Sequence, residues 1–342
     1  MKKALKIILF NVAFIIFLLM LYELFIFFLV QHPSLLKKCP MIIRNSIGHL
    51  YNSEIRHNIQ FSPNCARFDK NLGYILKPGH CIHSSIEFSN SYFINSIGVR
   101  DDELSLDHPE IIVSGDSFAM GWGVNQEETF AQLLEQKTGM RVLNASVSSY
   151  GTAREMIMLK RVPTDKLKYL IIQYCGNDFG ENKSFFLDHN VLQTMSKEKY
   201  HYHVAEDQRK KYVFGKYVLM EIENRIKETF YSNNSNSDEN NPIDKDEIDL
   251  FINAIIHSDL DFKNVQIIAF VMNGRIADDN KEFPATLKKK ITRHDYPDYI
   301  RKMIIVDFSN ILNDDNFYVL DDHMNKTGHA VVADVLYKKI LK

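Results

Sequence analysis

Three polar residues of the types used in acyl transfer each stand a few positions after a short apolar run. They are Ser117, Asn177 and His323. A serine hydroxyl is a weak nucleophile until a base takes its proton during attack. Histidine suits the role of that base, because imidazole exchanges protons near neutral pH. The three residue types indicate attack of a serine on an acyl carbonyl, although a Gly-Asp-Ser turn alone could equally be structural.

The same chemistry needs a carboxylate that holds the imidazole in the correct tautomer and stabilises the imidazolium that forms. Asp321, two residues before His323, is the predicted acid, and Asp322 ranks behind it. Two other acids, Asp116 and Asp178, are expected to hold their turns by accepting backbone hydrogen bonds.

An acyl-transfer site also needs donors for the negative oxygen of the tetrahedral intermediate. Each fixed donor is typically worth about 2.7 to 4 kcal/mol. The predicted donors of this oxyanion hole are the side-chain amide of Asn177 and the backbone N–H groups of Ser117 and Ser149, with Gly151 as a secondary candidate.

Three further residues could have either a structural or a functional role: His329, Trp122 and Cys175. His329 follows Gly328 at a predicted helix start, and we expect it to face solvent or to cap a helix rather than to act as the base. Trp122 is as well suited to packing as to lining an acyl pocket. Cys175 stands in an apolar run and is expected to be a small buried residue rather than a nucleophile.

The elements that must position these residues follow an alternating pattern. From Pro109 onward, apolar runs alternate with amphipathic segments, which predicts a parallel sheet covered by helices on both faces. The predicted strands are Ile111–Ser114, Arg141–Leu143, Tyr169–Tyr174, Val265–Val271 and Met303–Val306, and the predicted helices are Glu127–Thr138, Thr152–Arg161 and the segment after Gly328. Open α/β sheets bind ligands at the carboxyl ends of their strands, so the candidate residues should meet at one edge.

The loops at this edge resemble the motif blocks of the SGNH (GDSL-type) hydrolase superfamily. Gly115-Asp116-Ser117 is similar to the nucleophile block, Cys175-Gly176-Asn177-Asp178 to the asparagine block, and Asp321 to His323 to the acid and base block. The resemblance covers roughly residues 70 to 342, including Asn95–Arg100 and Gly121–Asn125. It implies a three-layer α/β/α fold of flavodoxin-like type, a Ser-His-Asp mechanism without metal or cofactor, and activity on ester-linked acyl groups.

The sequence departs from the family pattern at three positions. The second block of the family usually supplies a glycine N–H to the oxyanion hole, whereas Ser149 stands there in this chain. Cys175 replaces the first glycine of the asparagine block. The usual acid lies three residues before the histidine, where this chain has Leu320, so Asp321 follows a shorter spacing.

A long apolar segment stands near the amino terminus. Of the 24 residues from Ile7 to Val30, 19 are Ile, Leu, Phe or Val, and Lys2, Lys3 and Lys6 precede them. These side chains favour membrane insertion by about 6 to 11 kcal/mol, against a cost of about 3 kcal/mol for Glu23. We expect an uncleaved single-pass anchor with its amino terminus inside, which places the rest of the chain in the periplasm or outside the cell.

The expected organisation is therefore an anchor at residues 1–30, a connecting region at 31–105 and a hydrolase domain at 106–342. The connecting region contains strand-like pieces and predicts a small β-hairpin module without identifiable chemistry. An insertion at about 181–242 is aromatic in its first half and ends in the polar run Ser232–Pro242, a predicted surface loop. The aromatic half could form a lid over a substrate or a helical addition packed on the domain.

Composition and cysteine usage exclude several classes of function. A net charge of −2 with scattered Lys and Glu gives no basic face for nucleic acid. The spacing of Cys and His indicates no zinc site. Cys65 and Cys81 could form a disulfide bond if the compartment is oxidising.

These observations predict a membrane-anchored serine esterase that acts on acyl groups, such as O-acetyl, of an envelope or secreted glycan. Lipid esters are the next substrate class. One alternative is a glycan O-acyltransferase that works with a membrane acyl-donor protein. Another is a catalytically silent module for polysaccharide binding or assembly, which the serine at position 149 favours and the Ser, Asn and His residues oppose.

Overall fold

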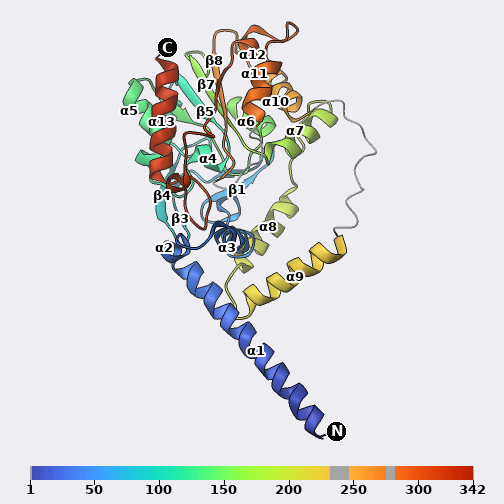
Figure 1. Cartoon of the computed structure of the whole chain (residues 1–342). Helices are drawn as coiled ribbons and strands as arrows, with labels where there is room; N and C mark the ends of the chain where they lie inside the picture. The colour runs from blue at the N-terminus through green and yellow to red at the C-terminus, as the bar shows by residue number, and fades with distance from the viewer. Residues whose placement is uncertain (1, 232–245, 275–281, 342) are drawn as a thin grey trace. The chain divides into compact units, whose positions relative to one another are not determined.

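The computed structural model describes residues 2–231, 246–274 and 282–341 of the chain, and Figure 1 labels its α-helices and several of its strands. The polar run Ser232–Pro242 lies outside the described residues. The chain divides into two compact units. Unit 1 consists of Met1–Arg56, Arg209–Ile243 and Val319–Asp321, and unit 2 consists of His57–Gln208, Asp244–Tyr318 and Asp322–Lys342.

Unit 2 is built around a five-stranded parallel sheet. Its strands are β5 (Ile111–Ser114), β6 (Val142–Asn144), β7 (Tyr169–Tyr174), β8 (Gln266–Val271) and β9 (Ile304–Val306). Their spatial order is β6-β5-β7-β8-β9, the doubly wound order of flavodoxin-like folds. All five predicted strands are present with bounds shifted by at most one residue, because consecutive β-branched and apolar residues buried on both faces give a clear signal.

Apolar side chains of the sheet point alternately to its two faces. Ile111 and Val113 of β5 enter one hydrophobic cluster, whereas Ile112 enters the other. Helices α5 (Phe130–Thr138) and α13 (Lys326–Ile340) cover the first face. Helices α6 (Thr152–Leu159), α10 (Glu247–Ile256) and α11 (Phe283–Lys290) cover the second. Figure 1 shows these two groups on opposite sides of the strands, which confirms the predicted three-layer α/β/α fold.

Two antiparallel hairpins precede the sheet in unit 2. They are formed by β1 (Ala66–Asp69) with β2 (Gly73–Leu76) and by β3 (Gly79–Ser84) with β4 (Ser89–Ile94). Cys65 and Cys81 are joined by a disulfide bond. The hairpins agree with the β module expected for this region. Short 3-10 turns lie at Ile59–Phe61, Leu104–Leu106, Gln126–Glu128 and Asp314–Asn316.

The inserted segment is helical in its described part. Helix α7 (Asp178–Leu187) packs on α6 and α10 through Phe185. Helix α8 (Lys197–Arg209) places Tyr200 against the rings of Phe61, Phe68 and Tyr74. Of the two alternatives for the aromatic half, this packing agrees with a helical addition. Short helices α4 (Ser117–Met120) and α12 (Asp298–Arg301) complete unit 2.

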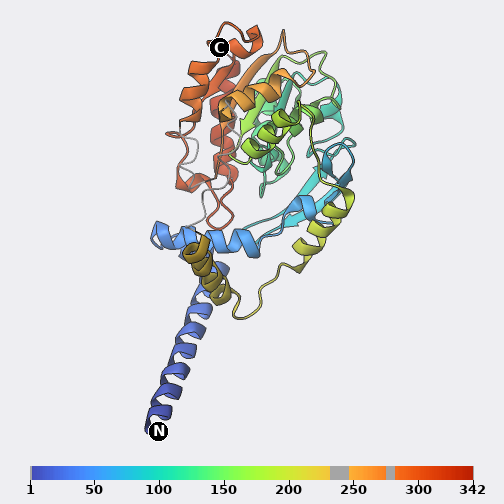
Figure 2. The same cartoon turned by 90° about the vertical axis from the view of Figure 1, so that its right-hand side faces the viewer.

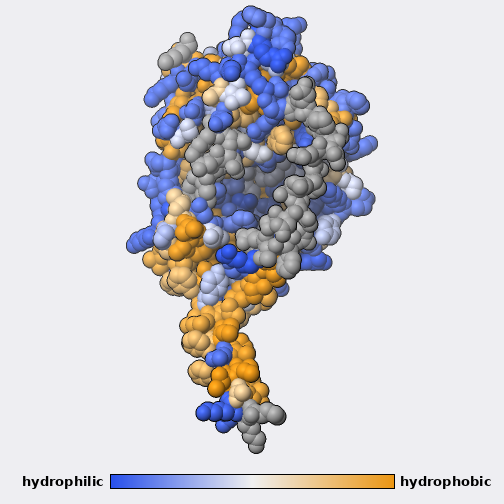
Figure 3. Space-filling view, turned by 45° about the vertical axis from the view of Figure 1, so that its right-hand side comes forward, coloured by the Kyte–Doolittle hydropathy of each residue, from blue (hydrophilic) through white to orange (hydrophobic). Residues whose placement is uncertain are grey.

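Unit 1 contains the helices α1 (Lys2–Gln31), α2 (Pro33–Leu36), α3 (Met41–Glu54) and α9 (Lys216–Tyr231). Within the described ranges, one helix is long and apolar enough to cross a membrane: Lys3–Gln31, with a mean hydropathy of 2.8. Figure 3 shows mostly apolar side chains on the face of this helix that is in view. Helix α3 lies in a region where the sequence predicted turns and strands. The helix was not predicted because its apolar residues are too irregularly spaced.

His329 lies in the core of unit 2, and of the two alternatives expected for it, facing solvent and capping a helix, the structure supports the second. It is 1% exposed, and its Nδ1 accepts a hydrogen bond of 3.2 Å from the N–H of Phe130. Phe130 is the first residue of α5, so the imidazole caps that helix from α13. Burial lowers the pKa of His329 from 6.5 to about 3, because the charged form loses its hydration.

We predict that His329 weakens the fold as the pH falls. The unfolded chain takes up a proton on this residue below about pH 6.5, whereas the folded chain does so only near pH 3. The free energy of unfolding should therefore fall across this window, by up to about 1.4 kcal/mol per pH unit for one proton. In His329→Gln, denaturant unfolding of the detergent-solubilised chain, followed by circular dichroism, should show a shallower pH slope.

The matched control for this prediction is His201→Gln, because His201 is exposed on α8. Its pH slope should equal that of the wild type. Equal slopes in all three proteins would contradict the assigned role of His329.

Candidate active site

Ser117 lies at a sharp turn between β5 and α4. Asp116 accepts a hydrogen bond of 2.9 Å from the N–H of Phe118 through its carboxylate and donates its own N–H to Gln173 Oε1 at 3.1 Å. This confirms that Asp116 holds the turn. A Cβ at Gly115 would lie 2.6 Å from both Ala119 Cβ and Gln173 Oε1, so the turn requires glycine. The turn leaves the Ser117 side chain at the carboxyl edge of the sheet.

His323 meets this serine from a loop that lies 206 positions later in the chain. Its Nε2 lies 2.7 Å from Ser117 Oγ, within hydrogen-bonding distance. The loop that carries His323 is closed by the bridge between Phe317 and Met324, and the N–H of Tyr318 donates to the carbonyl of His323 at 2.9 Å. A serine and a histidine predicted from separate loops are therefore brought together.

Two aromatic side chains stack on the His323 imidazole. The ring of Phe118 lies 4.5 Å away and that of Trp122 lies 5.0 Å away, with interplanar angles of 28° and 19°. Trp122 is 2% exposed and also contacts His83. Of its two interpretations, packing is the one these contacts support, and the packing fixes the plane of the imidazole.

The two candidate acids have different surroundings. Asp321 is fully buried, and both its carboxylate and its carbonyl accept hydrogen bonds of 3.4 Å from Arg56. Asp322 has a φ of 69°, and its carboxylate lies directly over the Cα of Gly274, where a side chain would not fit. The role of Asp321 as the acid that orients His323 stays a prediction.

Ser149 lies in an exposed turn after β6 with a φ of 60°. This left-handed conformation is one that glycine adopts at no cost, which agrees with the glycine that the resembled family has in this block. Gln60 holds the turn, since its amide donates to Ser149 Oγ at 3.0 Å and accepts from Ser148 Oγ at 3.1 Å. The Tyr74 hydroxyl adds a hydrogen bond of 2.8 Å to the carbonyl of Ser148.

The first turn of α6 is capped by side chains of α7. Three successive N–H groups donate to them: Gly151 to Glu181 Oε1 at 3.1 Å, Thr152 to Asp178 Oδ2 at 3.2 Å, and Ala153 to Asn182 Oδ1 at 3.0 Å. The N–H of Gly151 is thus occupied, which leaves the N–H groups of Ser117 and Ser149 as the predicted backbone donors. The Asp178 carboxylate thus holds the start of the neighbouring helix, whereas its own turn is closed by the hydrogen bond of 2.9 Å from its backbone N–H to the carbonyl of Cys175.

Asn177 immediately precedes α7 and is exposed. The caps between α6 and α7 therefore fix its loop relative to the Ser149 turn. The loop is also held by Asn273, which accepts the N–H of Gly176 at 2.7 Å. The structure places the candidate donors on the loops after β5, β6 and β7, the three adjacent strands at the topological switch point.

Behind the serine turn lie several buried acidic groups. Burial raises the pKa of Asp116, and it raises the pKa of Glu155 and of Asp178 well above the usual range, with further increases from their mutual repulsion. Burial likewise raises the pKa of the Cys175 thiol. A thiol with a raised pKa is a poor nucleophile at neutral pH, so Cys175 is structural. Within the described ranges, no group of three or more Cys, His, Asp or Glu residues could hold a metal ion.

Arg100 is a positioning residue that the sequence did not reveal. It is fully buried, with its guanidinium 3.6 Å from the centre of the Tyr92 ring. It donates to the carbonyls of the loop that follows the serine helix: Met120 at 3.3 Å, Val124 at 2.6 Å, and Gly121. The connecting region at residues 31–105, for which no chemistry was identified, thus holds the loop that carries Trp122. The motif Asn95–Arg100 was the only signal of this role.

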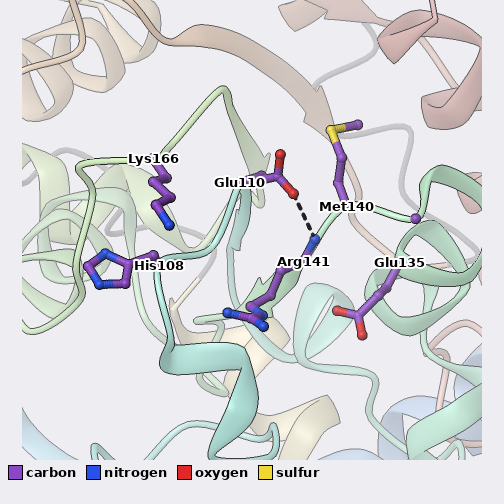
Figure 4. A pocket seen from close by; sticks show the side chains of 7 residues that line it. His108, Glu110, Glu135, Met140, Arg141 and Lys166 are labelled. Atoms are coloured by element: carbon purple, nitrogen blue, oxygen red, sulfur yellow. Dashed lines mark hydrogen bonds between the residues drawn. The ribbon is translucent and has the colours of Figure 1, made fainter.

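Among the described residues, cavities also lie away from the Ser117–His323 contact. One, of about 480 Å³, is lined by His108, Glu110, Glu135, Arg141 and Lys166 (Figure 4). Its residues precede β5, β6 and β7, so it lies at the amino edge of the sheet, opposite to Ser117. A second, of about 400 Å³, lies beside the loop of Trp122 and is lined by Phe88, Asn90, Gly123, Tyr318 and Asn325 among others.

Comparison with protein-family models gives no match, and neither does comparison with curated proteins. Among solved structures, the chain is similar to a G-D-S-L family protein from Desulfitobacterium hafniense, with 14% identity over 67% of this chain and 98% of that one and a TM-score of 0.35. It is also similar to a carbohydrate esterase family 2 enzyme from Corynascus thermopiles, with 14% identity over 67% of this chain and 64% of that one and a TM-score of 0.39. A further carbohydrate esterase structure matches at 12% identity over 68% of each chain, with a TM-score of 0.35.

We predict that Arg100→Met lowers the free energy of unfolding by about 3 kcal/mol, because it leaves the buried carbonyls of Met120, Gly121 and Val124 without their donor. Denaturant unfolding followed by circular dichroism measures this change. Arg293→Met is the control, since Arg293 is half exposed and pairs with Asp295 on the surface. Its effect should stay within about 0.5 kcal/mol. Equal effects of the two substitutions would contradict the role given to Arg100.

Proposed function

We propose that this chain is a membrane-anchored serine esterase of the SGNH type, acting on ester-linked acyl groups. The observation that carries the proposal is the distance of 2.7 Å between Ser117 Oγ and His323 Nε2. A hydroxyl and an imidazole in this relation form the nucleophile and base pair of acyl transfer. The three-layer fold and the position of Ser117 at the switch point of the sheet support the same conclusion.

In the proposed reaction, Ser117 Oγ attacks the carbonyl carbon of the ester while His323 Nε2 takes the hydroxyl proton. The N–H groups of Ser117 and Ser149 and the side-chain amide of Asn177 stabilise the negative oxygen of the tetrahedral intermediate. His323 then gives the proton to the leaving alcohol, and an acyl group stays on Ser117. Water, activated in turn by His323, attacks this acyl group and restores the serine.

Asp321 is the proposed acid of the triad. A carboxylate beside the imidazole selects its tautomer and stabilises the positive charge that develops during attack. The complete burial of Asp321 and its place two residues before His323 support this choice. Arg56 and Asp321 form an ion pair of 3.4 Å, which holds the proposed acid in place.

We propose that α1 anchors the chain and that the catalytic domain faces the periplasm or the cell exterior. The length and hydropathy of α1 support the anchor. The disulfide bond between Cys65 and Cys81 supports an oxidising compartment. From this location we infer that the substrate is an acylated glycan of the envelope or a secreted glycan, with O-acetyl as the acyl group, and that lipid esters come second.

Transfer of the acyl group to a glycan hydroxyl is the alternative, with a membrane acyl-donor protein as partner. It would use the same serine and histidine and differ only in the acceptor. Measuring whether a sugar hydroxyl competes with water for the acyl group would separate the two. The silent binding module is less favoured, because a serine and a histidine in hydrogen-bonding contact are not needed for binding alone.

We predict that a fluorophosphonate probe labels the full chain at Ser117. Ser117→Ala should abolish labelling, and Ser117→Ala or His323→Ala should lower turnover of p-nitrophenyl acetate on the order of 10³-fold or more. Ser91→Ala is the matched control, since Ser91 is exposed on β4 and belongs to none of the candidate loops. Labelling that survives in Ser117→Ala would rule out the proposed nucleophile.

A second prediction concerns the oxyanion hole. Asn177→Ala should lower the turnover number by about 10²-fold to 10³-fold with little change in KM, because the amide acts on charge that develops only in the transition state. Asn71→Ala, at an exposed position of the β1–β2 turn, should leave both constants unchanged. A loss that appears in KM alone would assign Asn177 to substrate binding instead.

A further inference from the structure

The exposure of α1 changes abruptly along its length. From Lys3 to Tyr22, every residue is exposed. From Glu23 onward, one side of the helix is buried by other parts of unit 1, with Glu23 1%, Ile26 5% and Val30 0% exposed. The fully exposed part has a length of about 30 Å at 1.5 Å per residue, which equals the thickness of the hydrocarbon core of a bilayer. If α1 is the proposed anchor, its lipid-covered part ends near Tyr22 rather than at Val30.

Glu23 then stands at the outer boundary of the hydrocarbon, where it binds the start of α9. Its carboxylate accepts hydrogen bonds from the N–H groups of Tyr217 and Val218 at 3.4 and 2.9 Å and from the Tyr212 hydroxyl at 2.9 Å. Tyr217 and Val218 belong to the first turn of α9, whose N–H groups have no partner within the helix. Glu23, which the sequence analysis counted as unfavourable for membrane insertion, thus caps a second helix.

Helix α9 lies beside the carboxyl-terminal part of α1 in both Figure 1 and Figure 2. The ring of Tyr212 packs on that of Phe27 at 4.5 Å. The start of α9 is therefore held at the same level of α1 as Glu23. Aromatic side chains with a polar atom are common at this level of a membrane, where ring and hydroxyl meet different surroundings.

One face of α9 is apolar and is left exposed by the residues of unit 1 that the structure describes. Leu219, Ile222 and Ile226 are 66%, 47% and 51% exposed and, at spacings of three and four residues, form one stripe. Ion pairs of 3.0 Å (Glu221–Arg225) and 2.8 Å (Glu223–Lys227) flank the stripe. The preceding turn adds Val213 and Phe214, which are 57% and 55% exposed. An apolar stripe between charged residues is the pattern of a helix that lies in a membrane surface.

We propose that α9 lies in the outer surface of the bilayer that holds α1, with Leu219, Ile222 and Ile226 directed toward the acyl chains. The occupant of this apolar face is lipid, because the face begins where the lipid-covered part of α1 ends and Glu23 joins the two helices. Lys210 and Lys211, just before the helix, suit the charge of anionic lipid headgroups. The inference rests on the proposed anchor and adds a second, surface attachment to it.

The test places one fluorophore at a time on the full chain in vesicles of phosphatidylcholine and phosphatidylglycerol. Cys39→Ser and Cys175→Ser remove the free cysteines, and the Cys65–Cys81 bond is kept. A nitrobenzoxadiazole label is then attached at Ile222→Cys, on the stripe. Lys227→Cys, on the charged flank, is the matched control, and Phe14→Cys reports on the span. Lipids with a nitroxide near the headgroup or deep in the acyl chain quench the label according to its depth.

The label at position 222 should emit at shorter wavelength than that at 227 and should lose its emission with the shallow nitroxide. The label at position 14 should lose its emission with the deep nitroxide. Quenching at 14 without quenching at 222 would overturn the proposal while keeping the anchor. No quenching at 14 would overturn the anchor and with it the placement of α9.

A label at 222 that neither lipid nitroxide nor aqueous iodide reaches would mean that protein, such as a second copy of the chain, covers the stripe, and would also overturn the proposal. Glu23→Leu provides an independent check, because it removes the acceptor for the first turn of α9. The label at 222 should then lose part of its protection from iodide, whereas the label at 14 should not change.

Discussion

The hydrogen bond between Ser117 and His323 joins residues 206 positions apart in the chain, and the proposed chemistry depends on it. Neither side chain could hold this geometry by local structure alone. The serine is fixed because β5 ends in a turn that only glycine allows, and the imidazole because its loop is closed as a short bridge. Phe118 and Trp122 then restrict the plane of the ring, so the contact is prepared before any substrate arrives.

The loops around this contact are held largely by residues that take no part in the proposed reaction. Gln60, in the turn before the hairpins, and Tyr74, in β2, hold the Ser148–Ser149 turn, and Arg100 holds the loop of Trp122. The side chains of α7 cap α6, so the turns on either side of the expected oxyanion site form one connected piece. These polar residues form hydrogen bonds with polar groups of the loops and so hold the loops in place.

The parts that the sequence predicted well are those set by local pattern. Strands such as Ile111–Ser114 and Tyr169–Tyr174 are runs of apolar residues that only a buried sheet can accommodate, and their loops carried recognisable polar residues. The parts that it missed depend on contacts between distant segments. Arg100 gives no sign of which carbonyls it will meet, Arg56 lies 265 residues from its partner Asp321, and His329 is buried because α13 lies against α5. Helix α3 lacks the spacing of apolar residues that predicts a helix.

Trp122 is the only tryptophan of the chain, and its indole lies against the imidazole of His323. Indole emission responds to the charge and the motion of the groups that touch it. Because the chain has no other tryptophan, its tryptophan fluorescence arises next to the proposed catalytic base. A change in the charge of that imidazole, or the arrival of an acyl group at the neighbouring serine, would thus be visible without any attached dye.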